Sequence, residues 1–217
     1  MRLAMLPQSP QALFRYDTVW EEFLESAVAG WKEEAARQKA EEMAAFLELD
    51  GKKFSHPYDL SGGEMQRAAV GKLLLQRADI LLMDEPTKGL DETACGVVYE
   101  NLQKIKTSQS LGMLIITHDL QLARSICADI AVMYAGQIVE YGPQVLTGPR
   151  HPYTQAFLAA LPENGFQPLP GLPPLPQNHL PGCRFAPRCP SCQKRCLQEV
   201  PPVYDSGTAK VRCFLYA

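Results

Sequence analysis

Ile80-Leu81-Leu82-Met83-Asp84-Glu85-Pro86 decides the fold class of this chain, because four apolar residues in a row end at two carboxylates and a proline. Such a run is typical of a short strand that is buried in a parallel sheet and carries its polar residues at the carboxyl end. Helical patterns at residues 64–78 and 92–106 flank it, and residues 113–117 form a second apolar run. Strands and helices alternate, so the sequence predicts an α/β core.

The segments on either side of this core predict further elements. Residues 18–49 contain no proline and a single glycine, and they predict one or two surface helices. Residues 120–127 predict another short helix, and the apolar runs on the two sides of Ala135 and Gly136 are typical of a hairpin. Seven prolines within residues 162–181 predict an extended, semi-rigid connector before the C-terminal tail.

Composition excludes several classes of protein. The 217 residues are 46% hydrophobic and 21% charged, and no apolar stretch approaches the roughly 18 residues that a membrane-spanning helix needs. The N-terminus lacks the apolar core of a signal peptide, so we expect the chain to stay in the cytoplasm. A net charge of −3 gives no general attraction to nucleic acid, and no nucleic-acid partner is expected.

Both core strands end in residues that are suited to phosphate chemistry. Asp84 can hold Mg²⁺, usually through water, and Glu85 can orient or deprotonate an attacking water. Thr117-His118-Asp119 follows the second strand, so we expect His118 at the same edge of the sheet. An ordinary strand-to-turn transition explains the two carboxylates equally well, and a lone histidine at such a place is more often structural.

Leu60-Ser61-Gly62-Gly63-Glu64-Met65-Gln66-Arg67 places a serine and two glycines directly before a helix. Backbone N–H groups at a helix start bind anions, and glycines let a phosphate approach the backbone. Ser61, Gly62 and Gly63 are therefore candidate phosphate ligands. Taken alone, the segment is more simply explained as a capping box formed by Ser61 and Glu64.

Five of the seven cysteines lie in the last 35 residues of the chain. Without an export signal, such a cluster indicates a metal or iron–sulfur site rather than disulfides. Spacing alone favours Zn²⁺, because Cys189 and Cys192 form a common zinc half-site. Cys95 and Cys127 stand apart from the cluster and are expected to be small buried hydrophobic residues.

The order and spacing of these motifs resemble the ATP-binding subunits of ATP-binding-cassette (ABC) transporters. Residues 60–67 resemble the family signature, residues 80–85 its Walker B strand, Gly89-Leu90-Asp91 its D-loop and His118 its switch histidine. Leu6-Pro7-Gln8-Ser9-Pro10 is similar to the Q-loop, although the apolar strand before Gln8 is short. The resemblance covers nearly the whole chain.

The resemblance implies a function and its residues. Two such subunits sandwich ATP and Mg²⁺, with Glu85 and His118 as catalytic residues and Asp84 and Asp91 beside the nucleotide. Gln8 would couple this site to a helical subdomain and to integral-membrane permease subunits. The implied partners are those permease subunits and a second ABC ATPase subunit, and the implied place is the cytoplasmic side of the cell membrane, with peripheral attachment.

One motif of the family is missing from the 217 residues. They contain no G-x-x-x-x-G-K-[ST] loop, whose backbone and lysine hold the β- and γ-phosphates. We therefore expect a partial P-loop NTPase fold that does not bind ATP alone. A truncated reading frame, half of a split gene and a short subunit are the three explanations.

The C-terminal tail resembles one branch of the family. His151-Pro152-Tyr153-Thr154 and Gly182-Cys183-Arg184-Phe185 are similar to the C-terminal extension of ABC ATPases that drive import of dipeptides, oligopeptides and nickel. The resemblance implies a [4Fe–4S] cluster, with Zn²⁺ as the alternative, held by Cys183, Cys189, Cys196 and Cys213, while Cys192 is extra. Nearby basic residues either offset the charge of such a centre or form a solvated surface: Arg184, Arg188, Lys194 and Arg195.

The sequence therefore predicts three parts. Residues 1–148 form a partial ABC ATPase domain, with a helical subdomain at about 14–78 and a Walker B and H-loop core at 79–148. Residues 149–181 form the connector, and 182–217 form the cysteine-rich unit. Two rival interpretations are a non-transport ABC ATPase and a non-catalytic accessory subunit, and the missing phosphate loop favours the second.

Overall fold

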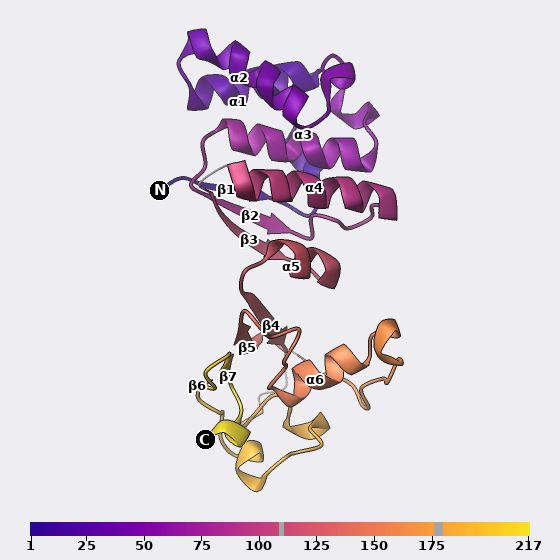
Figure 1. The fold of residues 1–217 in the computed structure, drawn as a ribbon, viewed down its shortest axis with the longest axis vertical. Helices are drawn as coiled ribbons and strands as arrows, with labels where there is room; N and C mark the ends of the chain where they lie inside the picture. The colour runs from indigo at the N-terminus through magenta and orange to yellow at the C-terminus, as the bar shows by residue number, and fades with distance from the viewer. Residues whose placement is uncertain (109–110, 176–179) are drawn as a thin grey trace. The chain divides into compact units, whose positions relative to one another are not determined.

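The computed structural model describes residues 1–108, 111–175 and 180–217 (Figure 1). These residues form two compact units, Met1–Ile126 and Cys127–Ala217. The first contains the predicted α/β core and the second contains the cysteine-rich tail.

A three-stranded parallel sheet with the order β1-β2-β3 forms the base of the first unit. Strand β1 (Leu3–Leu6) pairs with β2 (Ile80–Asp84), which pairs in turn with β3 (Gly112–Ile116). Leu6 lies opposite Met83 and Asp84 lies opposite Ile116, so the carboxyl ends of all three strands share one edge. The predicted α/β core with parallel strands is confirmed.

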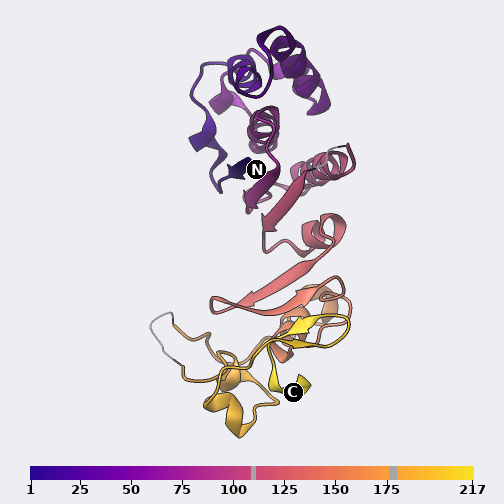
Figure 2. The ribbon, with the colours of Figure 1, turned by 90° about the vertical axis from the view of Figure 1, so that its left-hand side faces the viewer.

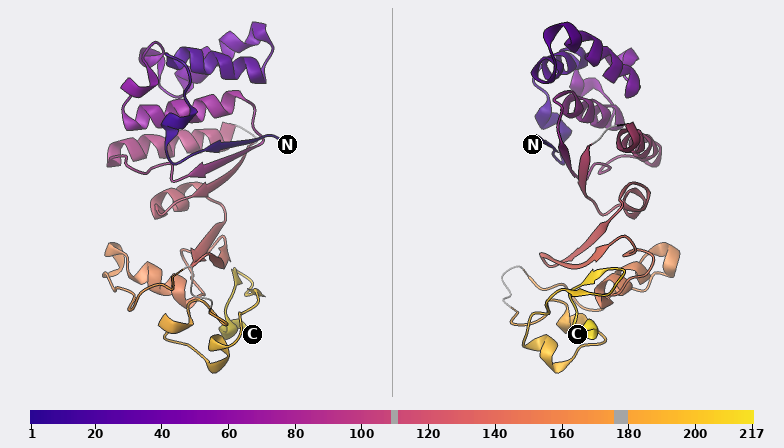
Figure 3. Two further views of the ribbon diagram at one scale, coloured as in Figure 1. Left: turned by 180° about the vertical axis from the view of Figure 1, so that it is seen from behind. Right: turned by 60° about the vertical axis from the view of Figure 1, so that its left-hand side comes forward.

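Five α-helices accompany this sheet, and the predicted region 18–49 contains two of them. They are α1 (Val19–Gly30), α2 (Glu33–Phe46), α3 (Gly62–Leu75), α4 (Glu92–Ser108) and α5 (Leu120–Ile126) among the described residues. In Figure 1, α1 and α2 lie beyond α3 on the side away from the strands, and the view from behind in Figure 3 gives the same order. A short 3-10 turn at Pro10–Leu13 lies between β1 and α1, and two more, at Asp50–Lys52 and Pro57–Asp59, lie between α2 and α3.

Only one face of the sheet is covered within the described residues. Leu6, Leu81 and Met83 are at most 1% exposed and belong to the core that the helices share. On the other face Leu114 and Ile116 are 59% and 61% exposed. The prediction that strand 113–117 is buried is therefore wrong for this face, because parallel sheets hide both faces only when helices cover each side.

Helices α1 and α3 pack closely, and a buried ion pair lies between them. A Cβ at Gly71 would lie 2.8 Å from Cζ of Phe23, so glycine permits this approach. Nζ of Lys72 contacts a carboxylate oxygen of Glu22, and both side chains are almost fully buried. Lys72 also donates to the carbonyl oxygen of Leu13 at 2.8 Å. The pair was not predicted, since Lys72 falls at an ordinary position of a helical pattern.

The second unit contains an antiparallel sheet with the order β4-β5-β7-β6. Strands β4 (Ile130–Tyr134) and β5 (Gln137–Gly142) form the predicted hairpin (Figure 2). Its turn residues Ala135 and Gly136 have φ of 46° and 79°, as a two-residue hairpin turn of type I′ requires. The sequence did not predict β6 (Tyr204–Asp205), β7 (Lys210–Val211) or helix α6 (Pro152–Ala159).

Strand β7 from the cysteine-rich tail pairs with β5 of the hairpin. The compact units thus divide at 126/127, whereas the predicted boundaries at 148/149 and 181/182 follow family motifs and composition and stay predictions. Part of the proline-rich connector is also held in place. Leu169 packs against Tyr134 and Phe185, and Nε of Arg188 donates to the carbonyl oxygen of Pro170 at 2.8 Å. Residues 176–179 of the connector lie outside the described residues.

Candidate functional site

The carboxyl edge of the parallel sheet gathers four of the predicted site residues. Gln8 lies two residues beyond the end of β1, Asp84 ends β2 with Glu85 next to it, and His118 lies two residues beyond β3. Because neighbouring strands run parallel and in register, these segments leave the sheet side by side. Ligands of open α/β sheets bind at such an edge.

Glu85 and His118 are in direct contact. Nδ1 of His118 lies 2.8 Å from Oε2 of Glu85, and the backbone N–H of His118 points to the same oxygen at 3.4 Å. The Glu85 side chain is 17% exposed, whereas the His118 ring is 76% exposed, so one face of the pair is open to a ligand. Glu85 also has φ of 50°, a backbone conformation that is uncommon for non-glycine residues.

The side chains of Asp84 and Gln8 make no hydrogen bond to the other described residues, whereas the Asp84 backbone lies in the β2–β3 ladder. Asp84 is partly buried, and the exposed Gln8 lies on the loop after β1. A carboxylate without a protein partner at the end of a buried strand is free to hold a divalent cation, directly or through water. The predicted roles of the two residues stay predictions.

Asp91 has a structural task in this chain. Its Oδ1 accepts the backbone N–H of Ala94 at 2.8 Å, which caps the first turn of α4. Gly89 has φ of 75°, so the turn before Asp91 needs the conformational freedom of glycine. The predicted place of Asp91 beside the nucleotide stays a prediction.

Ser61 and Glu64 form the capping box that the sequence offered as the simpler alternative. The backbone N–H and the hydroxyl of Ser61 both lie 2.9 Å from Oε2 of Glu64, and Oγ of Ser61 accepts the backbone N–H of Glu64 at 3.4 Å. The hydrogen bond from the Ser61 backbone holds the pKa of Glu64 below its ordinary value. Ideal Cβ atoms at Gly62 and Gly63 would approach Leu90 and Ala94, so this helix start lies beside the D-loop segment.

Sequence reasoning missed a second set of polar residues behind the Glu85–His118 pair. The carboxylate of Asp119 accepts hydrogen bonds from Thr87 and Tyr99. Thr117-His118-Asp119 was recognised as a motif, but only its histidine was singled out. The position of Asp119 next to a candidate catalytic residue was the available signal.

The four predicted cysteine ligands lie within the second unit and are partly or fully buried. Cys183 packs with Cys189 in one apolar cluster and with Cys196 in another, and its backbone N–H donates to the carbonyl oxygen of Cys196 at 2.8 Å. Cys213 packs in a neighbouring cluster, and Cys192 is exposed. Within the described part of the chain, however, no three His, Cys, Asp or Glu side chains are placed so that they could hold a metal ion.

Backbone N–H groups point at these sulfur atoms. Burial raises the pKa of the Cys183 and Cys213 thiols, while N–H groups of Phe185 and Leu215 respectively oppose that rise. Burial raises the pKa of Cys189 to about 11, and the N–H of Ser191 opposes it. Donors of this kind stabilise a thiolate more than a thiol.

Three of the four basic residues near the cysteines bind backbone carbonyl groups. Arg184 donates to Ala135, Arg188 to Leu169 and Pro170, and Arg195 to Phe214. Arg195 also lies over the ring of Phe214, with Cζ 4.3 Å from the ring centroid. These side chains therefore tie the second unit together, beyond any effect of their charge on the thiols.

The HPYT motif joins several parts of the second unit. Nδ1 of His151 accepts the backbone N–H of Tyr153 at 3.0 Å and caps α6, and Glu140 of β5 accepts the backbone N–H of His151 at 3.0 Å. The rings of Tyr134 and Tyr153 pack against Phe185, which is two residues from Cys183. The motif thus anchors the segment that carries the first cysteine.

Comparison with known families gives two matches along the chain. The family described as "ABC transporter" matches residues 1–88, and the family described as "Oligopeptide/dipeptide transporter, C-terminal region" matches residues 139–196. The chain thus combines an ABC transporter domain with the C-terminal region of oligopeptide/dipeptide transporters. The predicted resemblance, including the C-terminal extension, is confirmed.

Individual relatives agree with this assignment. "Dipeptide transport ATP-binding protein DppD" of Haemophilus influenzae is 38% identical over 165 residues, which are 73% of this chain and 50% of that protein. The chain thus spans about half the length of the curated relatives that it matches.

Solved structures show the same fold. CbiO1 of Clostridium perfringens, part of an ABC transporter complex, matches with a TM-score of 0.61 at 22% sequence identity. The match covers 66% of this chain and 58% of the CbiO1 chain. MJ1267, an ATP-binding cassette of an ABC transporter, matches with a TM-score of 0.56 at 26% sequence identity. This match covers 65% of this chain and 61% of the MJ1267 chain. The chain therefore shares the P-loop NTPase type of fold with these ATP-binding cassettes.

No helix among the described residues combines the length and the apolar character that crossing a bilayer requires. This agrees with the sequence analysis, which found no such stretch.

Proposed function

We propose that this chain is an ATP-binding subunit that powers import of peptides through a membrane permease. The contact between Glu85 and His118 at the carboxyl edge of the sheet carries the proposal, because it joins a general base to the residue that orients it. The match to the ABC transporter family and the matched C-terminal region of peptide transporters support it. Nickel is the alternative cargo.

The residues of the edge have separate tasks in this proposal. The carboxylate of Asp84, which has no hydrogen-bond partner among the described residues, would hold Mg²⁺ through water. Glu85 orients and deprotonates the attacking water, and the ring of His118 fixes the Glu85 carboxylate at 2.8 Å. Gln8, on the neighbouring loop, would report the state of this edge to the helices that follow it.

We further propose that ATP binding needs a phosphate loop from another polypeptide segment, since the 217 residues contain none. The open face of the sheet, with Leu114 and Ile116 exposed, supports this proposal. In a two-subunit sandwich, Ser61–Gly63 would face the phosphate loop of the second subunit. The Glu85–His118 pair would face the phosphate loop that completes this chain's own half of the sandwich.

An ATPase assay distinguishes the role of the Ser61–Gly63 segment from that of the Glu85–His118 pair. The chain alone should hydrolyse no ATP, and mixing it with a full-length homologous subunit should give activity at one composite site. Gly62→Asp should abolish that activity, because it places a carboxylate against the γ-phosphate. Glu85→Gln should matter little, because the ATP at that composite site would be hydrolysed with the glutamate of the full-length subunit. Gly62→Ala is the matched control, since its Cβ would already meet Cδ2 of Leu90 at 3.0 Å and reports crowding without charge.

The outcomes discriminate between the proposals. Loss of activity with Glu85→Gln as severe as with Gly62→Asp would show that a phosphate loop reaches the edge of this chain's own sheet. If neither variant changes the rate of the mixture, the chain is a non-catalytic accessory subunit and the ATPase proposal fails. DNA-stimulated hydrolysis would instead favour a non-transport ABC ATPase.

We also propose that Cys183, Cys189, Cys196 and Cys213, which are not gathered as a metal site in this structure, come together to bind a [4Fe–4S] cluster, with Zn²⁺ as the alternative. Four thiols in one unit, with backbone N–H donors at their sulfur atoms, support thiolate ligation. Protein purified without oxygen should be brown and contain about four irons per chain. Cys183→Ser should remove the colour and the exposed Cys192→Ser should not. Colourless protein with one zinc would assign the site to zinc, and protein without either metal would refute it.

Peripheral attachment to the cytoplasmic side of the membrane follows from the proposed partners, which are permease subunits and a second ATPase subunit. Alkaline carbonate should release the chain from membranes that contain the permease. Retention in the lipid fraction after such a wash would contradict peripheral attachment.

A further inference from the structure

Asp119 links three segments behind the Glu85–His118 pair. Its Oδ2 accepts hydrogen bonds from Oγ1 of Thr87, at 3.1 Å, and from the hydroxyl of Tyr99. Its Oδ1 accepts the backbone N–H groups of Gln121 and Leu122, each at 3.0 Å, which caps α5. Each oxygen of this carboxylate thus accepts two hydrogen bonds from within the first unit.

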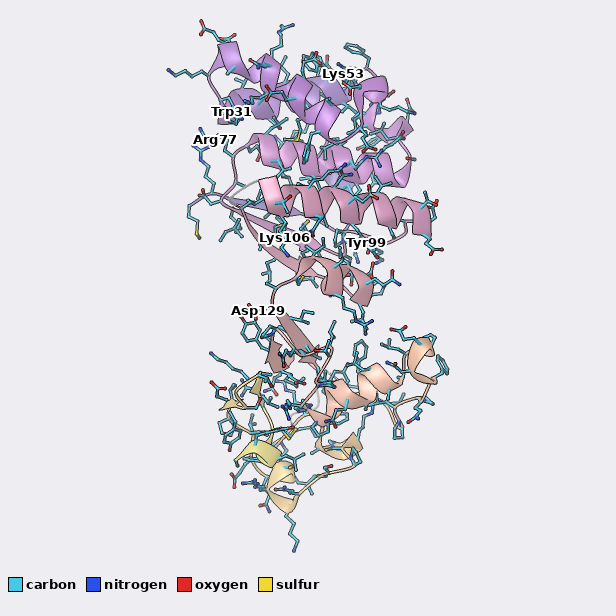
Figure 4. The ribbon with its side chains drawn as sticks, viewed as in Figure 1. Trp31, Lys53, Arg77, Tyr99, Lys106 and Asp129 are labelled. Carbon is cyan, nitrogen blue, oxygen red and sulfur yellow. The ribbon has the colours of Figure 1, made fainter. Side chains whose placement is uncertain are left out.

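The link joins the two turns that carry the pair. Thr87 lies two residues after Glu85 and is only 7% exposed, and Asp119 directly follows His118. Tyr99 comes from α4, on the side of that helix toward α5 (Figure 4). A hydrogen-bonded cross-link through Asp119 thus joins the turns that carry Glu85 and His118, with α4 as its third point.

Electrostatics fix the direction of these hydrogen bonds. Burial raises the pKa of Tyr99 above its ordinary value, and the neighbouring Asp119 raises it further. Burial works to raise the pKa of Asp119, but the hydrogen bonds from Tyr99, Leu122 and Thr87 outweigh it and lower that pKa. At neutral pH the phenol donates and the carboxylate accepts.

We propose that Tyr99 is a positioning residue for the Glu85–His118 pair, acting through Asp119. Only its consequence for hydrolysis rests on the proposed function, because the cross-link and the pair are features of the chain itself. Removing the Tyr99 hydroxyl leaves the Asp119 carboxylate with one donor fewer, and the turn at His118 then samples positions away from Glu85.

The tautomer of His118 reports this positioning directly. With Nδ1 at 2.8 Å from the Glu85 carboxylate, the neutral ring carries its proton on Nδ1. An imidazole without such a partner favours the proton on Nε2. Nitrogen chemical shifts of a ¹⁵N-histidine-labelled chain measure the ratio of the two forms at a pH where the ring is neutral.

Tyr99→Phe is the test, and it is conservative because the ring is kept. We expect the fraction of the Nδ1–H form at His118 to fall by about twofold or more, and the backbone amide of His118 to exchange about tenfold faster, since a hydrogen bond to a charged group is lost. Thr87→Val should change both readouts in the same direction. Tyr216→Phe is the matched control, because it removes a hydroxyl that donates to the Arg150 carbonyl in the other unit.

An unchanged tautomer ratio in Tyr99→Phe overturns the proposal. A tyrosine that only stabilised α4 would lower resistance to urea and leave this ratio as it is in the wild type. Because the readout needs no nucleotide and no partner, failure of the ATPase proposal does not affect it. If the wild-type ring already carries its proton on Nε2, the pair itself is absent in solution and the proposal falls as well.

Discussion

Replacing Lys72 by methionine tests the buried ion pair in the first unit. In the wild type, Nζ of Lys72 contacts the Glu22 carboxylate and donates to the Leu13 carbonyl at 2.8 Å. Methionine keeps most of the volume and the apolar stem but removes the charge and both hydrogen bonds. Glu22, which is 0% exposed, then remains as a buried anion whose nearest donors are the backbone N–H groups of Arg15 and Tyr16.

The expected cost follows from this residual hydrogen bonding. Removing one partner of a buried ion pair destabilises a protein by about 3–5 kcal/mol. Two backbone donors still solvate the Glu22 carboxylate, so we expect the lower end, about 3 kcal/mol. With a urea m-value of about 2 kcal/mol/M, the unfolding midpoint should fall by about 1.5 M.

Tryptophan fluorescence is the assay, because both tryptophans of the chain, Trp20 and Trp31, lie in the first unit. The unfolding of this unit is thus followed without a signal from the cysteine-rich unit. Combining Lys72→Met with Glu22→Gln should recover part of the loss, since glutamine keeps an acceptor for the two backbone donors and carries no charge. Lys104→Met, which removes an exposed contact to Glu48 at 3.3 Å, should leave the midpoint unchanged.

Two results would refute this reasoning. A midpoint that moves no more for Lys72→Met than for Lys104→Met would mean that Glu22 reaches water or a proton in the folded state. A double variant that is less stable than Lys72→Met alone would show that the negative charge itself, and not its pairing, stabilises the loop at residues 13–16.

Three further predictions concern the second unit. Burial lowers the pKa of His151 to about 4, below its ordinary 6.5, so the unfolded chain takes up a proton that the folded unit excludes. The free energy of opening of α6, measured by native-state hydrogen exchange, should be highest above pH 6.5 and should fall by about 3 kcal/mol as the pH is lowered to about 4. His151→Asn should remove this pH dependence. The buried Oγ1 of Thr154 has no hydrogen-bond partner among the residues that the structure describes. Thr154→Val should therefore slow hydrogen exchange in α6, by up to about 1 kcal/mol of stability, and faster exchange would reveal a partner for the hydroxyl. A Cβ at Gly182 would lie 2.2 Å from the carbonyl oxygen of Cys196. Gly182→Ala should therefore expose the buried Cys196 to a thiol reagent in metal-free protein. An unchanged number of fast-reacting thiols would contradict this.

The sequence determined the elements whose signals are local. Four apolar residues before Asp84 specify a strand, Ser61 and Glu64 specify a capped helix start, and Ala135-Gly136 specifies a hairpin turn. Hydrophobic period and capping depend on residues within a turn or two of each other, so no long-range contact is needed to recognise them. The motif order added the family and the residues of the candidate site.

Only the tertiary structure decided which of these residues meet. The 2.8 Å contact of Glu85 with His118 joins segments more than thirty residues apart and depends on the register of β2 against β3. The Tyr99–Asp119 hydrogen bond and the Glu22–Lys72 pair join different elements as well, and a charged residue in a helical pattern looks alike in sequence whether it faces solvent or a buried partner. Likewise, composition marked the tail as a separate part, but the pairing of β7 with β5 joins it to the hairpin. Strand pairing is non-local, so two short segments seventy residues apart show no sign of it in the sequence.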